Sequence, residues 1–245
     1  MQNILGNIRK AIQDFSMINE GDKIAIGLSG GKDSLALLYS LANLRKFYEK
    51  HFELMAITID AGFDGFDTTN LMKICEELDV EYIVYKSDIK EIVFDIRKEK
   101  NPCSLCANLR RGMLNSVAKE NGCNKVALGH HQDDVIETLL MSLFYEGHIH
   151  TFSPVTYLSR KDITIIRPMI YLTENEIKKW IKDMNLITMK KCCEADGFTT
   201  REEIKNFIQD YTKKIPYFKS NLFGAVKRSN INGWNTNEKE EINEE

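Results

Sequence analysis

DKIAIGLSGGKDSLALL, residues 22–38, decides the fold of this 245-residue chain. DKIAIG has the pattern of a short buried strand, and KDSLALL that of the start of an apolar helix. Between them stand Gly30 and Gly31, which allow close backbone approach and let N–H groups turn inward. Unpaired amides and the helix dipole both favour negative charge at such a joint. The stretch therefore predicts an anion-binding loop at the end of a strand.

The side chains of this loop fit a phosphate ligand that carries a metal ion. Ser29 and Ser34 can donate hydroxyl hydrogen bonds, and Lys32 can place its ammonium on phosphate oxygens. Asp33 would repel bound phosphates unless a divalent cation lay between them, so it indicates Mg²⁺. The spacing differs from the common nucleotide loop G-x-x-x-x-G-K-[ST], because the glycine counted from Gly27 falls one position early. An ordinary glycine turn with a helix N-cap is the simpler alternative.

Strand-like and helix-like segments alternate along the first 150 residues. Four segments have the apolar pattern of buried strands: 22–27, 52–60, 81–88 and 124–131. Four segments that follow them read as helices: 32–50, 68–80, 104–122 and 133–147. This alternation implies right-handed βαβ crossovers, and hence an α/β fold whose parallel sheet is covered by helices on both faces.

The two ends of the chain differ from this central pattern. Periodic apolar residues predict a helix over 3–17, and the weaker pattern after residue 150 predicts a strand at 163–172 and helices at 174–185 and 200–214. We therefore expect four parts: an N-terminal helix in 1–20, the main α/β domain in 21–170, a small, mostly helical C-terminal extension in 171–228, and a disordered acidic tail in 229–245.

Composition and charge argue against a membrane-spanning protein and leave nucleic-acid binding open. The chain is 43% hydrophobic and 28% charged, without an apolar run near the roughly 20 residues that span a bilayer. We expect a cytoplasmic protein with no membrane partner. The net charge is −3, but the last eight residues carry five Glu and one Lys, so the rest sums to about +1. Short basic clusters such as Arg110–Arg111 could contact nucleic-acid phosphates, although solvated helix faces explain them equally well.

The segment LGHHQDDVIETLL, residues 128–140, follows the fourth predicted strand. Open α/β sheets bind ligands at the carboxyl ends of their strands, which makes this segment a second candidate for the site. We expect His130 and His131 to be structural, hydrogen-bonded histidines. Asp133 and Asp134 could serve as a helix N-cap pair as well as bind a ligand.

Six cysteines fall into two classes. Cys75 and Cys123 stand singly in apolar patterns, and we expect them to be small core residues. Cys103 and Cys106 form a C-x-x-C at the start of a predicted helix, a spacing that aims two thiolates at one metal. This pair alone fits zinc, an iron–sulfur cluster or a redox couple. Two further cysteines, Cys192 and Cys193, occur late in the chain.

SGGKDS after a buried strand resembles the PP-loop of the N-type ATP pyrophosphatases, which cleave ATP between the α and β phosphates and adenylate their substrate. The resemblance implies a Rossmann-like sheet of the adenine-nucleotide α-hydrolase type, a PP-loop domain over 21–170, and ATP with Mg²⁺ as ligands. In this family a G-H-x-x-D-D segment helps to hold ATP and its metal, which corresponds here to Gly129 and Asp134. The implied nucleotide-binding residues are Ser29, Gly30, Gly31, Lys32, Asp33, Ser34, Gly129 and Asp134, with Asp33 at the magnesium.

The ordered combination of the PP-loop, CSLCANLRRG, LGHHQDD and a late cysteine is similar to the tRNA 2-thiocytidine-synthesising sulfurtransferases over about residues 3–215. This resemblance implies a [4Fe–4S] cluster on Cys103, Cys106 and Cys193, with one iron left without a protein ligand. Cys192 is the alternative third ligand, because two adjacent cysteines followed by Glu194 depart from the family pattern. The short acidic C-terminal region also departs from it.

The implied reaction is ATP-dependent thiolation of a tRNA cytidine in the anticodon loop, with Lys32, Asp33 and Asp134 as catalytic residues. Implied partners are tRNA, ATP and a sulfur donor such as a cysteine desulfurase or inorganic sulfide, and a homodimer is one arrangement. Thiolation of another tRNA base or cluster-dependent desulfidation are the alternatives, and desulfidation would need no ATP. A lysidine-synthase-like activity would leave the cysteines unused. A nucleotide-binding protein with structural zinc is the alternative from a different class.

Overall fold

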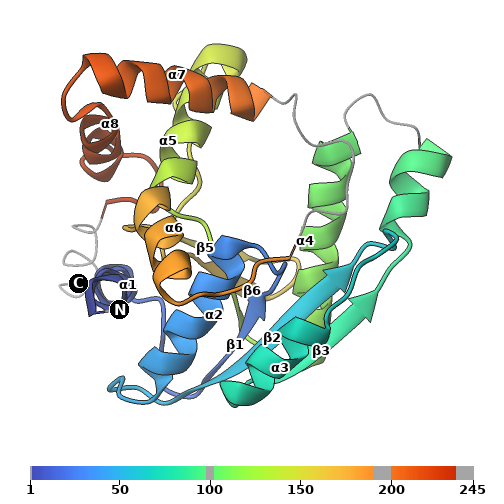
Figure 1. Cartoon of the computed structure of the whole chain (residues 1–245). Coiled ribbons are helices and arrows are strands. Elements are labelled where there is room, and N and C mark those ends of the chain that lie inside the picture. The colour runs from blue at the N-terminus through green and yellow to red at the C-terminus, as the bar shows by residue number, and fades with distance from the viewer. Residues whose placement is uncertain (1, 98–101, 190–199, 236–245) are drawn as a thin grey trace.

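The computed structural model describes residues 2–97, 102–189 and 200–235. One six-stranded sheet with the order β3-β2-β1-β4-β6-β5 forms its centre (Figure 1). The strands are β1 Asp22–Gly27, β2 Phe52–Asp60, β3 Glu81–Lys86, β4 Lys125–Ala127, β5 Val155–Leu158 and β6 Ile163–Ile166. Every neighbouring pair is parallel except β5 with β6. The predicted α/β fold with a mainly parallel sheet is confirmed.

Successive side chains of β1 divide between two cores, as the two-residue period of a strand requires. Ile24 and Ile26 belong to the larger core, and Ala25 between them belongs to the second. Helix α4 (Pro102–Glu120) covers the second core. Helices from both halves of the chain contribute to the larger core, among them α1 Gln2–Asp14, α2 Lys32–Arg45, α3 Thr69–Glu77, α5 Gln132–Met141 and α6 Glu174–Asp183. Both faces of the sheet are therefore covered, which explains the nearly continuous apolar pattern of its strands.

Two helices, α7 (Thr200–Lys214) and α8 (Phe218–Lys227), pack against α5 in the C-terminal part (Figure 1). After α8 the chain returns to the larger core, where Trp234 is 1% exposed and donates its indole N–H to the carbonyl of Phe152 at 3.1 Å. The prediction of a disordered tail from residue 229 is therefore wrong as far as residue 235, because this tryptophan anchors the segment. The rest of the predicted tail, 236–245, lies outside the described residues.

Several elements have no counterpart in the predicted pattern. These are β5, α8 and the π-helical segment η1 Glu91–Arg97, whereas the π-helical segment η2 Ser142–Glu146 follows α5 directly and lies within the helix predicted over 133–147. Strand β5 has four residues without a clear alternation, and the N-cap of α8 is Tyr217 and not a Ser, Thr, Asp or Asn. The strand predicted over 163–172 ends at Ile166, because the chain then forms a turn in which Ile170 N–H donates to the carbonyl of Arg167.

Other local predictions are confirmed. One side of α1 is buried, and α5 with η2 ends at Gly147 in the left-handed conformation typical of helix termini. Cys75 and Cys123 are each 1% exposed, and burial raises the pKa of Cys75 to about 12. Within the described ranges, every helix is too short or too polar to span a bilayer.

Candidate nucleotide and metal site

The site lies at the carboxyl ends of β1 and β4, where the sheet order changes direction. The chain runs from β1 through β2 to β3 on one side, and from β4 to β6 and β5 on the other. Ligands of open α/β sheets bind at such a switch point. A cleft of about 340 Å³ opens there. It is lined by Gly27–Ser29, Asp33, Ser34, Ile57–Ile59, Phe66, Arg110, Arg111, Leu114, Leu128–His130 and Asp134.

The loop between β1 and α2 has the geometry expected of a phosphate cradle. Gly30 has a φ of +76°, in the left-handed region that glycine adopts without strain. Gly31 is the N-cap of α2 and has no side chain that could accept hydrogen bonds from the first-turn amides. These N–H groups therefore remain free to bind a phosphate. Ser34 Oγ donates to the Gly31 carbonyl at 2.9 Å, and Ser29 Oγ donates to Ser34 Oγ at 3.2 Å. The hydroxyls thus brace the loop from within.

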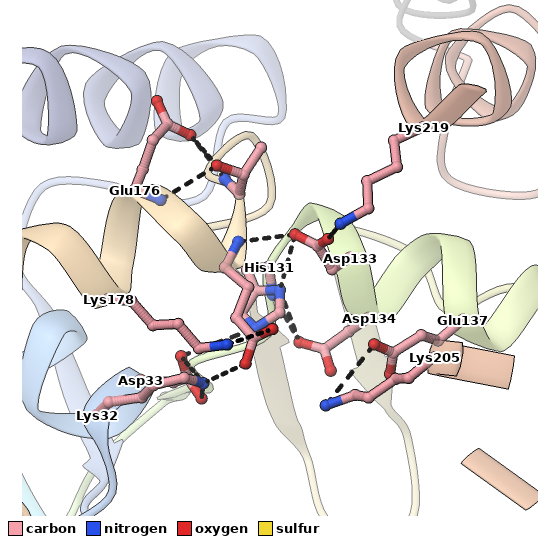
Figure 2. A network of polar contacts seen from close by, with 12 residues as sticks. Lys32, Asp33, His131, Asp133, Asp134, Glu137, Glu176, Lys178, Lys205 and Lys219 are labelled. Carbon is pink, nitrogen blue, oxygen red and sulfur yellow. Dashed lines mark hydrogen bonds and ion pairs between the residues drawn. The ribbon is translucent and has the colours of Figure 1, made fainter. Parts of the chain in front are cut away.

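Lys32 is held by two carboxylates at the mouth of this loop. Its Nζ lies 2.8 Å from Asp33 Oδ2 (Figure 2). The same Nζ lies 3.1 Å from Glu174 Oε1. Burial alone would raise the pKa of Glu174, but its ion pairs with Lys32 and Lys178 lower it to about 2. The pKa of Lys32 is raised by the same carboxylates, against the opposing effect of its own burial. A phosphate that binds here meets a lysine that is charged and already paired.

Gly129 brings the second predicted segment against the first. A Cβ at this position would lie 3.1 Å from the backbone C and O atoms of Asp33 and 3.3 Å from its Cβ. Only a glycine allows the end of β4 to pack this closely on the first turn of α2. The structure therefore brings Gly129 and the loop residues 29–34 together at one end of the sheet.

The two aspartates at the start of α5 have different surroundings. Asp134 Oδ2 accepts the backbone N–H of His131 at 2.9 Å, and Asp134 also lines the cleft. Asp133 is 5% exposed and pairs with Lys219 of α8 at 2.5 Å, as Figure 2 shows. It also accepts the backbone N–H of Glu174 at 2.7 Å. Asp134 is therefore available to a ligand, whereas Asp133 joins three helices.

His131 lies among carboxylates, in the centre of Figure 2. It is 4% exposed, with Nε2 3.7 Å from Asp33 Oδ1 and Nδ1 3.4 Å from Asp134 Oδ2. It thus connects Asp33, which the sequence assigns to Mg²⁺, with Asp134, which the family resemblance places near ATP and its metal. Among the described residues no three His, Cys, Asp or Glu side chains already form a metal site, so the oxygen donors Asp33 and Asp134 fit Mg²⁺ only together with phosphate oxygens and water.

Helix α7 adds charged side chains to the site that the sequence pattern did not reveal. Arg201 lies 3.7 Å from Asp134 and 3.5 Å from Glu137, and Lys205 lies 3.9 Å from Glu137. Glu137 is 3% exposed, and burial raises its pKa to about 7 despite these cations. The sequence pattern likewise did not reveal Glu174, which forms an ion pair with Lys32. The sequence signal T-E-N-E locates a capping box at Thr173, but not the contact with a loop far along the chain.

Cys103 and Cys106 lie at the start of α4, one helical turn apart and partly buried. Cys106 packs on a small cluster around Ile89 and Val93. Soft thiolates at this spacing fit two ligands of an iron–sulfur cluster or of zinc. Cys192 and Cys193 lie outside the described residues. Met189, the last described residue before them, donates its backbone N–H to the carbonyl of Gly30 at 2.9 Å.

Comparisons with known proteins agree with this geometry. The model of the PP-loop domain family matches residues 2–212. The chain is 38% identical to the tRNA-cytidine(32) 2-sulfurtransferase of Syntrophotalea carbinolica over 220 residues, which cover 89% of this chain and 85% of that one. It is also 38% identical to the enzyme of that name from Hahella chejuensis, covering 90% of this chain and 78% of that one.

A solved structure extends the likeness to three dimensions. The U34-tRNA thiolase NcsA from Methanococcus maripaludis, determined with its [4Fe–4S] cluster, superposes with a TM-score of 0.73 at 27% identity. The superposition covers 90% of this chain and 76% of the thiolase.

Proposed function

Because this chain belongs to the PP-loop domain family, and within it to the tRNA-cytidine 2-sulfurtransferases, we propose that it is an ATP-dependent tRNA thiolase. It replaces the C2 oxygen of a cytidine in the anticodon loop with sulfur, and position 32 is the target that the names of its relatives indicate. The observation that carries the proposal is a single cleft lined both by residues of the phosphate loop, such as Ser29, and by Arg110 of α4. Arg110 lies one helical turn after Cys106 on that helix.

The phosphate loop would bind the β and γ phosphates of ATP, with Lys32 moving from Asp33 and Glu174 onto phosphate oxygens. Attack by the C2 oxygen on the α-phosphorus forms one P–O bond and breaks the bond to the β-phosphate, which releases pyrophosphate. The base oxygen then belongs to an AMP ester, which leaves readily when a sulfur nucleophile takes its place at C2. Lys32 and the amides of α2 would stabilise charge on the departing pyrophosphate. Mg²⁺, held by Asp33 and Asp134, would add to this stabilisation.

A cluster held by Cys103, Cys106 and, as the expected third ligand, Cys193 would carry the sulfur that a donor provides. Cys192 remains the alternative to Cys193. The two described thiols fit this role because they are partly buried, adjacent on one helix and close in sequence to cleft residues. A cysteine desulfurase or inorganic sulfide is the proposed source of sulfur, the cytoplasm the proposed location, and a homodimer the proposed assembly.

Arg110 and Arg111 are the residues that we assign to RNA. Both line the cleft, and guanidinium groups can pair with phosphates or stack on an unstacked base. A base inside a helical stem could not reach the cleft, so a loop nucleotide that swings out of the stack is the substrate that fits.

The test is thiolation by the purified protein. Protein reconstituted anaerobically with iron and sulfide is incubated with unmodified tRNA, ATP, Mg²⁺ and sulfide, and the nucleosides are analysed by mass spectrometry. We expect 2-thiocytidine that depends on ATP and is absent with Cys103→Ala. Formation of a different thionucleoside would correct the base. Loss of 2-thiocytidine from thiolated tRNA without ATP would instead establish desulfidation and overturn the proposal.

A further inference from the structure

His130 stands at the edge of the nucleotide cleft with one ring nitrogen already engaged. It follows β4 and lines the cleft. Arg167 Nε lies 3.2 Å from His130 Nδ1 and donates a hydrogen bond to it. The His130 ring also packs on the ring of Phe152, with centroids 4.9 Å apart. Among the described residues, no hydrogen-bond partner of the other nitrogen, Nε2, is found.

Arg167 is itself fixed from several sides. It is 9% exposed, its Nη1 donates to the Ser153 carbonyl at 2.6 Å and to Thr156 Oγ1 at 3.1 Å, and its guanidinium lies 4.9 Å from the Phe152 ring centroid. No carboxylate of the described residues pairs with this cation. Burial and the nearby Arg111 lower the pKa of Arg167 to about 10, so it remains charged at neutral pH.

The direction of the Arg167–His130 bond decides the tautomer of the histidine. An arginine has only N–H donors, so His130 Nδ1 must supply the lone pair. A neutral imidazole carries its single proton on the other nitrogen, which here is Nε2. A hydrogen bond to one ring nitrogen in this way fixes the orientation and the tautomer of a functional histidine.

We propose that Arg167 is a positioning residue that holds His130 as the Nε2–H tautomer, and that His130 donates this hydrogen bond to a substrate oxygen at the reacting centre. The oxygen is either on the α-phosphate of ATP or is the C2 oxygen of the target base. The inference rests on the proposed function, because it takes adenylation of a base as the reaction in the cleft. It gives a role to a histidine that the sequence pattern leaves as a structural one.

The surroundings of His130 suit a neutral donor and not a proton-transfer group. Burial, followed by the charges of Arg167, Arg111 and Arg201 and by neighbouring His131, lowers the pKa of His130 to about 3. The ring therefore stays neutral throughout the pH range in which enzymes of this kind work. A neutral N–H in a preorganised position stabilises developing charge on oxygen without having to exchange a proton.

A pair of side-chain amides tests the position of the donor. In His130→Gln the amide nitrogen can occupy the place of Nε2, whereas in His130→Asn the shorter amide reaches only the place of Nδ1. We expect adenylation of tRNA, measured as pyrophosphate release, to fall about fivefold or less for His130→Gln and about a hundredfold for His130→Asn. Equal activity of the two variants, each shown by thermal melting to be folded, would overturn the inference.

The two candidate oxygens are distinguished by nucleotide binding. If His130 contacts the α-phosphate, His130→Asn weakens ATP binding measured by calorimetry without tRNA. If it contacts the base oxygen, ATP binding is unchanged and only the tRNA-dependent release of pyrophosphate falls. Should the wild-type protein bind ATP but form no thionucleoside with any tRNA, the proposed function fails, whatever the two variants show.

A spectroscopic measurement tests Arg167 without any activity. Two-bond ¹⁵N–¹H spectra of the wild-type protein should show His130 as the pure Nε2–H tautomer from about pH 5 to 9. In Arg167→Met we expect a mixture of tautomers and a titration nearer the ordinary histidine pKa, with Arg167→Lys between the two. An Nδ1–H tautomer in the wild type would contradict the proposed geometry.

Discussion

Lys32 and Glu174 form a 3.1 Å ion pair that connects the phosphate loop to the first turn of α6. The same carboxylate lies 3.1 Å from Lys178, and the backbone N–H of Glu174 is held by Asp133. Glu174 thus holds Lys32 in place when no phosphate is bound. The same carboxylate competes with a phosphate for the ammonium group of Lys32. ATP binding must replace a carboxylate contact with a phosphate contact, and the affinity reflects the difference between the two.

Removing the charge of Glu174 should therefore tighten nucleotide binding. For Glu174→Gln we expect the Kd of Mg·ATP to fall about three- to tenfold, because Lys32 then no longer exchanges one anion for another. The depressed pKa of Glu174, about 2, means that this competition is present at every pH above about 3. Lys178→Ala is the matched control, since it contacts Glu174 without touching the loop. Weaker binding to Glu174→Gln would indicate that Glu174 helps to hold the metal.

Gly129→Ala should displace the first turn of α2 and so distort the phosphate loop. The added Cβ would meet the Asp33 backbone at 3.1 Å, which must shift the first turn of α2. We expect a loss of about 1–3 kcal/mol in the free energy of unfolding, and ATP binding weakened by about tenfold or more. Calorimetry and urea unfolding measure the two effects. Gly112→Ala, where a Cβ meets nothing within 4 Å on α4, should instead stabilise the helix by about 0.5–1 kcal/mol.

The raised pKa of Glu137 predicts how stability changes with pH. The native state keeps the Glu137 proton up to about pH 7, whereas the unfolded chain loses it near pH 4.5. The free energy of unfolding should therefore fall as the pH rises between these values, by about 2–3 kcal/mol, and then level off. Glu137→Gln should flatten this slope in urea titrations at successive pH values. The exposed Glu202→Gln serves as the control, and an unchanged slope in Glu137→Gln would show that Arg201 and Lys205 already compensate the buried charge.

The predictable parts of this protein were those encoded locally. A buried strand, two glycines and a helix start specify the phosphate loop, and apolar runs of strand length specify a parallel sheet. The partners of the loop were not predictable in this way. Glu174 reaches the site from the first turn of α6, and Arg167 from the turn after β6. Neither side chain has a periodic signature in the sequence. Resemblance pointed to Gly129, but only its 3.1 Å approach to Asp33 gives the physical reason for a glycine there.

If Asp33 binds Mg²⁺, its substitution should lower ATP-dependent pyrophosphate release without changing the content of the iron–sulfur cluster. For Asp33→Asn we expect ATP-dependent pyrophosphate release in the presence of tRNA to fall about a hundredfold or more, because the developing charge loses its metal-bound counterion. Iron and sulfide content should stay at the wild-type level, since Asp33 lies in the first turn of α2 and not on α4. Lys178→Ala again provides the control. Normal pyrophosphate release by Asp33→Asn would mean that this carboxylate does not hold the metal.

Substitution of either cysteine of the Cys103–Cys106 pair should have the opposite effect, with loss of the cluster and retained ATP binding. Cys103→Ala and Cys106→Ala should each lose most of the bound iron and acid-labile sulfide after anaerobic reconstitution, while calorimetry still detects ATP binding. The reason is that both thiols lie on α4, whereas the phosphate-binding residues lie between β1 and α2 and in the first turn of α2. Cys123→Ala is the matched control, because this thiol is 1% exposed in the second core, so its loss should lower the unfolding midpoint without changing the iron content. Zinc in place of iron in the wild-type protein, or full iron content in both α4 variants, would remove the cluster from the mechanism and leave a nucleotide-binding protein with a structural metal.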